Sequence, residues 1–280
     1  MDVEFIKMHG LGNDYVFIDC FKHEIPDEKF LPDLAKKISD RHFGVGGDGL
    51  ILILPGDKER VRMRIFNADG SEAEMCGNGI RCVGRYVFDS GIVTGRTIPI
   101  ETMKKTIVVS VIDSKNLMVD MGTPLTTDTG EELKEIAIED YTKGIVIDGK
   151  TYTYTPVAMP NPHAVIFVSD YNFNLHEIGR KIEHHPNFPN RTNVEFIQVY
   201  SREEIRMRVW ERGSGETMAC GTGACASVVA SVLNGFTDRE VLVHLNGGDL
   251  FIEWSDSDNH IYMTGPAEYT FTGTYYYEEE

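Results

Sequence analysis

Basic residues are scarce in this sequence. Lys and Arg total 27 against 44 Asp and Glu, so the formal net charge is −17 at pH 7. A protein that binds nucleic acid needs a basic surface to neutralise phosphates, and one that docks on an anionic membrane leaflet needs basic clusters. The composition therefore argues against both classes of partner, and the acidic surplus mainly favours solubility.

Cysteine is rare as well, and its spacing excludes the common cysteine sites. The number is odd, and no Cys-x-x-Cys pair occurs among Cys20, Cys76, Cys82, Cys220 and Cys225. Small secreted proteins instead carry an even, dense set of cysteines that form disulfides. No cysteine and histidine combine at the spacing of a structural zinc site. We therefore expect reduced thiols, no metal and no cofactor.

Long apolar runs and export signals are missing too. The longest apolar run, residues 50–54, is far shorter than the roughly 20 residues of a membrane-spanning helix. The chain begins Met1-Asp2-Val3-Glu4, without the basic and apolar regions of a signal peptide. We therefore predict a cytoplasmic protein with no membrane partner. Hydrophobic residues make up 41% of the chain, enough to fill packed cores, and 280 residues predict about two domains.

The two halves of the chain repeat each other. Residues 61–67 (VRMRIFN) and 76–79 (CGNG) match residues 205–211 (IRMRVWE) and 220–223 (CGTG) at one constant offset of 144 residues. The same offset pairs residues 49–53 with 193–197. Such self-similarity indicates two copies of one structural module.

Each copy shows the same local pattern. Alternating polar and apolar residues predict a strand with one buried face. A loop of about eight residues follows, and Cys-Gly-x-Gly then opens a helix that stops near a glycine. Further helices are expected over Leu31–Arg41 and Leu175–His185.

The expected fold class is α+β, with two pseudo-symmetric mixed α/β modules. Each module is predicted to be a curved, largely antiparallel sheet wrapped around a central helix. We expect an N-terminal module over residues 1–121, to which residues 267–280 return, and a C-terminal module over residues 122–266. The turn residues Gly122-Thr123-Pro124 fit the boundary between them.

Cys76 and Cys220 stand out because each is followed by Gly-x-Gly at a predicted helix start. The positive end of a helix dipole stabilises a thiolate and lowers its pKa. The glycines let a carboxylate approach the first N–H groups of the helix. Two such thiols can remove a proton from one face of a carbon and deliver one to the other face. The remaining cysteines are interpreted as core residues.

At these positions the sequence resembles the diaminopimelate epimerases. The resemblance runs from the first ten residues to Gly265-Pro266-Ala267-Glu268. It is carried by residues 8–15 (MHGLGNDY), 41–44 (RHFG), 66–72 (FNADGSE), 76–82 (CGNGIRC), 161–163 (NPH), 193–196 (NVEF) and 211–223 (ERGSGETMACGTG).

The resemblance implies a cofactor-independent epimerase that interconverts LL- and meso-2,6-diaminopimelate, for lysine and peptidoglycan precursor biosynthesis, and a homodimer. In the LL-to-meso direction it makes Cys220 the proton acceptor and Cys76 the donor. Backbone N–H groups of Gly77, Asn78, Gly221 and Thr222 would hold the carboxylate at the reacting carbon. Other polar groups of the substrate would bind Asn13, Asn67, Asn161, Asn193, Glu211 and Arg212, while His163 and Glu211 would tune the thiols. Where some members carry Gln, this chain has Gly49, which removes one side-chain contact.

Two other functions remain open at this point. A proline or hydroxyproline racemase could use the same pair of thiols, although the polar Glu211-Arg212 pair fits a dicarboxylic substrate better than proline. A binding protein without activity could use the thiols as a redox switch, which an assay of α-proton exchange would separate from an enzyme. A hydrolase is poorly supported because no Gly-x-Ser-x-Gly motif occurs.

Overall fold

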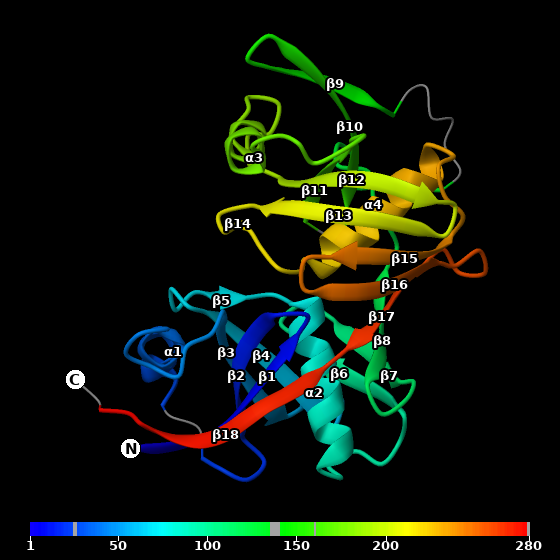
Figure 1. Ribbon diagram of the computed structural model, residues 1–280. Helices are drawn as coiled ribbons and strands as arrows, with labels where there is room; N and C mark the ends of the chain where they lie inside the picture. Colours follow the sequence, from blue (N-terminus) through cyan, green and yellow to red (C-terminus); the bar gives the residue numbers. More distant parts are fainter. Residues whose placement is uncertain (25–26, 135–140, 160, 279–280) are drawn as a thin grey trace. The chain divides into compact units, whose positions relative to one another are not determined.

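The chain divides into two compact units in the computed structural model (Figure 1), which describes residues 1–24, 27–134, 141–159 and 161–278. The first unit comprises Met1–Val119 and Gly265–Glu280, and the second comprises Asp120–Thr264. Each boundary lies two residues from the one expected from the sequence. Residues 279 and 280, at the end of the expected C-terminal segment, lie outside the described residues.

The first unit is a largely antiparallel sheet with two α-helices. Its strands follow the order β18-β1-β2-β3-β4-β6-β7-β8, and β5 lies beside β4. Only the pairs β2–β3 and β4–β6 are parallel. The bounds are β1 Asp2–Gly10, β2 Asn13–Asp19, β3 Gly49–Pro55, β4 Val61–Asn67, β5 Glu72–Ala73, β6 Thr97–Glu101, β7 Thr106–Val111, β8 Asn116–Gly122, β18 Glu268–Tyr276, α1 Leu31–Ser39 and α2 Gly77–Asp89, with a short 3-10 helix at Glu28–Phe30.

The second unit repeats this topology. Its strands follow the order β9-β10-β11-β12-β13-β15-β16-β17, with β14 beside β13, and only β11–β12 and β13–β15 are parallel. The bounds are β9 Lys143–Ile147, β10 Lys150–Ala158, β11 Pro162–Phe167, β12 Asn193–Ser201, β13 Glu204–Glu211, β14 Gly215–Glu216, β15 Glu240–Leu245, β16 Gly248–Trp254, β17 Ile261–Pro266, α3 Leu175–Glu183 and α4 Gly221–Leu233.

Strand register preserves the sequence repeat. Tyr15 pairs with Gly49 across β2 and β3, and His163 pairs with Asn193 across β11 and β12. Because Gly49 and Asn193 are 144 residues apart, the two sheets place equivalent residues side by side. The predicted α+β class with two repeated modules is therefore confirmed.

The helix that begins after the Cys-Gly-x-Gly cysteine packs against the sheet in each unit. In the first unit α2 lies against β1, β2 and β7, and in the second α4 lies against β10, β11, β12 and β16. Helix α4 is apolar on all sides, and most of its residues are buried, as expected for a helix enclosed by its sheet. Within the described ranges, no helix is long and apolar enough to cross a membrane.

Several elements differ from the sequence prediction. Helices α1 and α3 each end two residues earlier than expected, at Ser39 and Glu183. Strands β5, β6, β9, β10, β14 and β18 were not predicted. Strand β18 is exposed over most of its length, so it lacks the apolar alternation that marks a half-buried strand. It is recognised only by its pairing with β1.

Helix α3 is held against β13 by close packing at Gly179. A Cβ at this position would lie 2.6 Å from Trp210 Cβ, closer than atoms can approach without a shift. We predict that Gly179→Val destabilises the protein by about 1–3 kcal/mol, the usual cost of overpacking, measured by urea unfolding. Gly144→Ala is the control: the nearest atom to its new Cβ is Thr151 Cγ2 at 3.9 Å. Equal stability of the two variants would contradict the packing described here.

Candidate active site

Cys76 lies at the N-cap of α2 in the first unit. Its backbone is extended, and its Sγ accepts a hydrogen bond from the Gly79 N–H at 3.4 Å. The thiol also donates to Asn13 Oδ1 at 3.2 Å. The sulfur therefore has a donor suited to the thiolate and an acceptor suited to the thiol, so either protonation state finds a partner.

Asn13 links the thiol to a network of charges. Its Oδ1 also accepts from Asn78 Nδ2 at 3.2 Å, and its own Nδ2 donates to Asp48 Oδ2 at 2.7 Å. Arg41 donates to Asp48 Oδ1 at 2.9 Å and to Asp14 Oδ1 at 2.7 Å. Since every polar atom of the Asn13 amide has a fixed partner, the side chain is held in one orientation at the helix N-terminus.

Tyr15 is a further polar neighbour of Cys76, and sequence reasoning missed it. Burial, the charge of Cys76 and a hydrogen bond with its side chain raise the pKa of Tyr15 well above the ordinary value. The ring packs against Gly49, where a Cβ would lie 3.1 Å from Tyr15 Cε1 and 2.2 Å from the Phe66 carbonyl oxygen. The glycine at position 49 therefore leaves the space that the Tyr15 ring needs.

Cys220 occupies the equivalent N-cap of α4 in the second unit and is buried. Thr222 Oγ1 lies 3.6 Å from its Sγ, and the Gly223 N–H also hydrogen-bonds the side chain. The surrounding side chains include two carboxylates, whereas those around Cys76 are amides and a phenol. Glu211 hydrogen-bonds the thiol, and Glu195 lies near enough to act on it by charge.

The expected low pKa is wrong for Cys220. Burial raises the pKa of this thiol well above the usual value, and the negative charges of Glu211 and Glu195 raise it further. These effects outweigh the hydrogen bonds from Thr222 and the Gly223 N–H, which lower it. The helix N-terminus alone therefore does not produce a thiolate in the substrate-free protein.

Glu211 ends strand β13 beside the thiol, and Arg212 follows it. Thr217 Oγ1 donates to Glu211 Oε1 at 2.5 Å, and burial raises the pKa of Glu211. The Arg212 N–H donates to Asn193 Oδ1 at 2.9 Å, and its guanidinium reaches the Asn190 carbonyl at 3.3 Å. The Arg212 side chain is exposed, so it is accessible to an anionic ligand.

Glu183, at the end of α3, holds residues 210–213 in place through two hydrogen bonds. Its Oε2 accepts from Trp210 Nε1 at 2.7 Å, and its Oε1 accepts from the Gly213 N–H at 3.0 Å. The buried carboxylate thus binds the chain on both sides of Glu211 and Arg212. Sequence reasoning missed Glu183 because a single acidic residue near a helix end is usually a solvated one.

The other predicted site residues lie at or next to the ends of strands and helices. His163 is fully buried in β11, with its Nε2 3.1 Å from Asn161 Oδ1, and Asn193 Nδ2 donates to the Pro162 carbonyl at 3.0 Å. In the first unit, Asn67 Nδ2 donates to Ser71 Oγ at 3.0 Å. No contact joins Asn67 to Cys76 among the described interactions, so the structure brings it only to the adjacent turn. Gly77 and Asn78 begin α2, and Gly221 and Thr222 begin α4.

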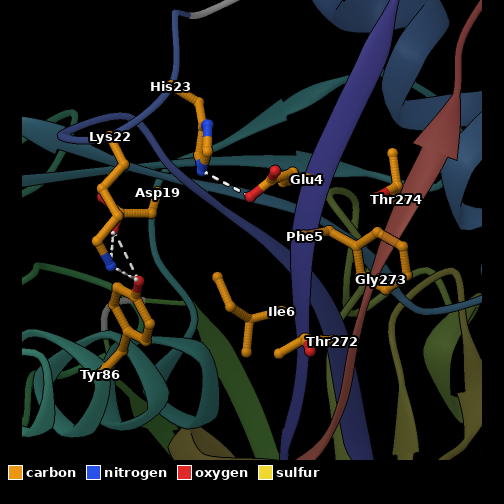
Figure 2. Close-up of a pocket in the computed structure, with 10 residues that line it drawn as sticks. All are labelled: Glu4, Phe5, Ile6, Asp19, Lys22, His23, Tyr86, Thr272, Gly273 and Thr274. Atoms are coloured by element: carbon orange, nitrogen blue, oxygen red, sulfur yellow. Dashed lines mark hydrogen bonds and ion pairs between the residues drawn. The ribbon is translucent and has the colours of Figure 1, made fainter.

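A pocket of about 370 Å³ in the first unit lies elsewhere (Figure 2). It is lined by Tyr86, in the last turns of α2, and by Asp19, at the end of β2, whereas Cys76 and Asn13 lie at the opposite ends of these elements. Lys22 bridges Tyr86 and Asp19, and His23 faces Glu4 at 3.1 Å. Because its charged groups pair with each other, we assign this pocket no role in the chemistry of the thiols.

Comparison with known proteins identifies the family. The family model described as "Diaminopimelate epimerase" matches residues 5–127 and 155–270. The diaminopimelate epimerase of Acetivibrio thermocellus is 51% identical over 276 residues, covering 97% of this chain and 98% of the relative. That of Desulfitobacterium hafniense is 53% identical over 281 residues, covering 97% of each chain.

The chain belongs to the diaminopimelate epimerase family. Solved structures share the fold of this family member at low sequence identity. A Bacillus anthracis phenazine biosynthesis protein of the PhzF family matches with a TM-score of 0.70, 14% identity and coverage of 98% of this chain and 99% of the other. A hydroxyproline epimerase from Agrobacterium vitis matches with the same TM-score and identity, over 98% of this chain and 92% of the other.

The family context gives the residues around Cys76 a direct test. We predict that Tyr15→Phe lowers kcat/KM for diaminopimelate about tenfold, since a hydrogen bond to an ionised group contributes about 1.5–3 kcal/mol and Gly79 N–H remains. The measurement is steady-state epimerisation. Tyr262→Phe, which removes a hydrogen bond to Asp258 in the second unit, is the control. Wild-type kinetics in Tyr15→Phe would show that the hydroxyl plays no part.

Proposed function

We propose that this chain interconverts LL- and meso-2,6-diaminopimelate with Cys76 and Cys220 as its two acid–base groups. As a member of the diaminopimelate epimerase family it is an isomerase whose substrate is an amino acid. The observation that carries the two-thiol mechanism is the duplication itself. Each unit has its own Cys-Gly-x-Gly at the start of its own helix, α2 or α4.

The chemical task is to stabilise charge that develops when the α-proton leaves. A proton beside a carboxylate is weakly acidic, and the developing negative charge needs preorganised donors. The first N–H groups of a helix have no partner within the helix and point along its axis. In this proposal the N–H groups of Gly77 and Asn78, with those of Gly221 and Thr222, bind the carboxylate at the reacting carbon.

Proton transfer uses the two thiols on opposite faces of that carbon. In the LL-to-meso direction Cys220 takes the α-proton and Cys76 gives its proton to the carbanion. Because the pKa of Cys220 is raised, its own proton must leave first. The Glu211 carboxylate, which hydrogen-bonds the thiol, can hold that proton. His163 acts on Glu211 by charge, lowering its pKa, so the two residues tune Cys220 together.

The distal amino acid is proposed to bind polar side chains of both units. Arg212 can grip the distal carboxylate with two parallel hydrogen bonds. Amide oxygens and Glu211 can accept from the distal ammonium. The amides assigned to this role are Asn13, Asn67, Asn161 and Asn193.

The wider setting follows from the reaction. Meso-diaminopimelate serves lysine and peptidoglycan precursor synthesis, so the proposed location is the cytoplasm. We propose a homodimer that acts on a small molecule, with no nucleic-acid or membrane partner. The net charge of −17 agrees with the last point.

Removing either thiol should abolish epimerisation. We predict that Cys76→Ser and Cys220→Ser each lose activity by several orders of magnitude, because each removes proton transfer on one face. The measurement is loss of the α-proton from LL-diaminopimelate in heavy water together with formation of the meso product. Cys225→Ser, a change at a buried cysteine inside α4, is the matched control. A Cys76 or Cys220 variant with more than about a tenth of wild-type activity would exclude the two-base mechanism.

Arg212 should distinguish diaminopimelate from shorter amino acids. A site built on polar pairs rejects analogues that leave its groups unpaired by on the order of 10⁴-fold. Lysine, which lacks the distal carboxylate, is therefore expected to be a very poor substrate. We predict that Arg212→Met costs about 2–5 kcal/mol in kcat/KM for diaminopimelate.

Kinetics on both substrates with both proteins test this assignment. Arg202→Met, which removes an exposed arginine paired with Asp238, controls for loss of a surface charge. Comparable racemisation of lysine or proline by the wild type, or a silent Arg212→Met, would refute the specificity while leaving the thiol chemistry untouched.

A further inference from the structure

Glu195 is a buried carboxylate beside the thiol site for which the mechanism above has no use. It lies in β12, with no exposed surface. Its Oε1 is 2.7 Å from His163 Nδ1. Its Oε2 has no hydrogen-bond partner among the described residues. A buried polar atom left unpaired costs about 1–3 kcal/mol, and more when charged, so its presence needs a reason.

His163 holds the Glu195 side chain in place. Its Nδ1 lies 2.7 Å from Glu195 Oε1, and its Nε2 lies 3.1 Å from Asn161 Oδ1. Because both ring nitrogens have a partner, the imidazole fixes the orientation of the Glu195 carboxyl group.

Glu195 and Cys220 both lie close to Gly223. A Cβ at Gly223 would lie 2.8 Å from Glu195 Oε1 and 3.3 Å from Cys220 Sγ. The carboxylate and the thiol thus flank one position, and the charge of Glu195 acts on the sulfur across it.

The first unit shows what this site looks like without the carboxylate. The repeat places Ile51 at the position of Glu195, and a Cβ at Gly79 would lie 2.7 Å from Ile51 Cδ1 and 3.7 Å from Cys76 Sγ. The strand pairing places Tyr15 at the position of His163. One thiol therefore has an isoleucine and a tyrosine behind it, and the other has a glutamate and a histidine.

We propose that Glu195 is a positioning residue for Cys220: the contact with His163 fixes its carboxylate beside the thiol, and its negative charge keeps the proton on Cys220 until substrate binds. The proposal rests on the proposed role of Cys220 as an acid–base group. In the substrate-free protein it places the proton on Cys220, although Cys76 occupies the equivalent position in the repeat.

The groups that act on Cys220 come from two strands and one helix. They are Glu195 from β12, Glu211 from β13, and Thr222 with the Gly223 N–H from α4, while His163 from β11 acts on Glu211. Glu211 and Glu195 both raise the pKa of the thiol, whereas Thr222 and the N–H lower it. Removal of the Glu195 charge must therefore lower the pH at which Cys220 ionises.

The test is the pH dependence of Cys220 alkylation in the full-length protein. Iodoacetamide is added in short pulses across a pH series, and mass spectrometry measures modification at each cysteine. In Glu195→Gln we expect the Cys220 midpoint to fall by about one pH unit or more, which is about a tenfold faster reaction below the midpoint. The midpoint is used because altered access to the buried thiol scales the rate without moving the midpoint.

A second variant and a control guard against a merely structural effect. Glu195→Ile reproduces the side chain of the first unit and should lower the midpoint as well. Glu203→Gln, a change at an exposed carboxylate of the same unit, should leave it unchanged.

A Cys220 midpoint that stays at its wild-type value in folded Glu195→Gln and Glu195→Ile would overturn the proposal. These measurements do not depend on turnover. If the wild type fails to exchange the α-proton of diaminopimelate, the proposed function falls, whatever the alkylation shows.

Discussion

The site depends on how closely a strand side chain can approach a thiol at the start of a helix. Gly79 and Gly223 set this distance, because a Cβ at either glycine would collide with the strand residue behind the thiol. The glycine therefore does more than expose helix N–H groups to a ligand. It lets the sheet pack closely against the helix N-terminus, so the strand residue at this position determines the electrostatic surroundings of the sulfur.

Duplication followed by divergence explains the unequal surroundings. Both units keep the same strand order, the same parallel pairs and the same N-cap cysteine. Cys76 has neutral amide and phenol neighbours, with charges one step further away at Asp48 and Arg41. Cys220 is enclosed by carboxylates and a histidine. A repeated scaffold thus holds two thiols in chemically distinct surroundings.

The sequence predicts the repeated framework well, because strand alternation and the Cys-Gly-x-Gly motif are local signals. It predicts poorly what depends on neighbours brought together by folding. Tyr15, Glu183 and Glu195 were missed because each acts through a contact with a residue distant in sequence, and none belongs to a motif with its partner. The raised pKa of Cys220 was missed for the same reason: the helix N-terminus is visible in the sequence, whereas burial and two carboxylates are not.

The pairing of β1 with β18 has a consequence for how the protein is made. The first unit contains both ends of the chain, joined along nearly the full length of these two strands, while the second unit is one continuous segment. On the ribosome the second unit has all its residues before the first does. Since domains fold as units and chain ends emerge in order, the first unit waits with β1 unpaired on this edge until the last strand is released. An exposed strand edge invites association with other chains, so loss of the last dozen residues would harm the half of the protein that is synthesised first.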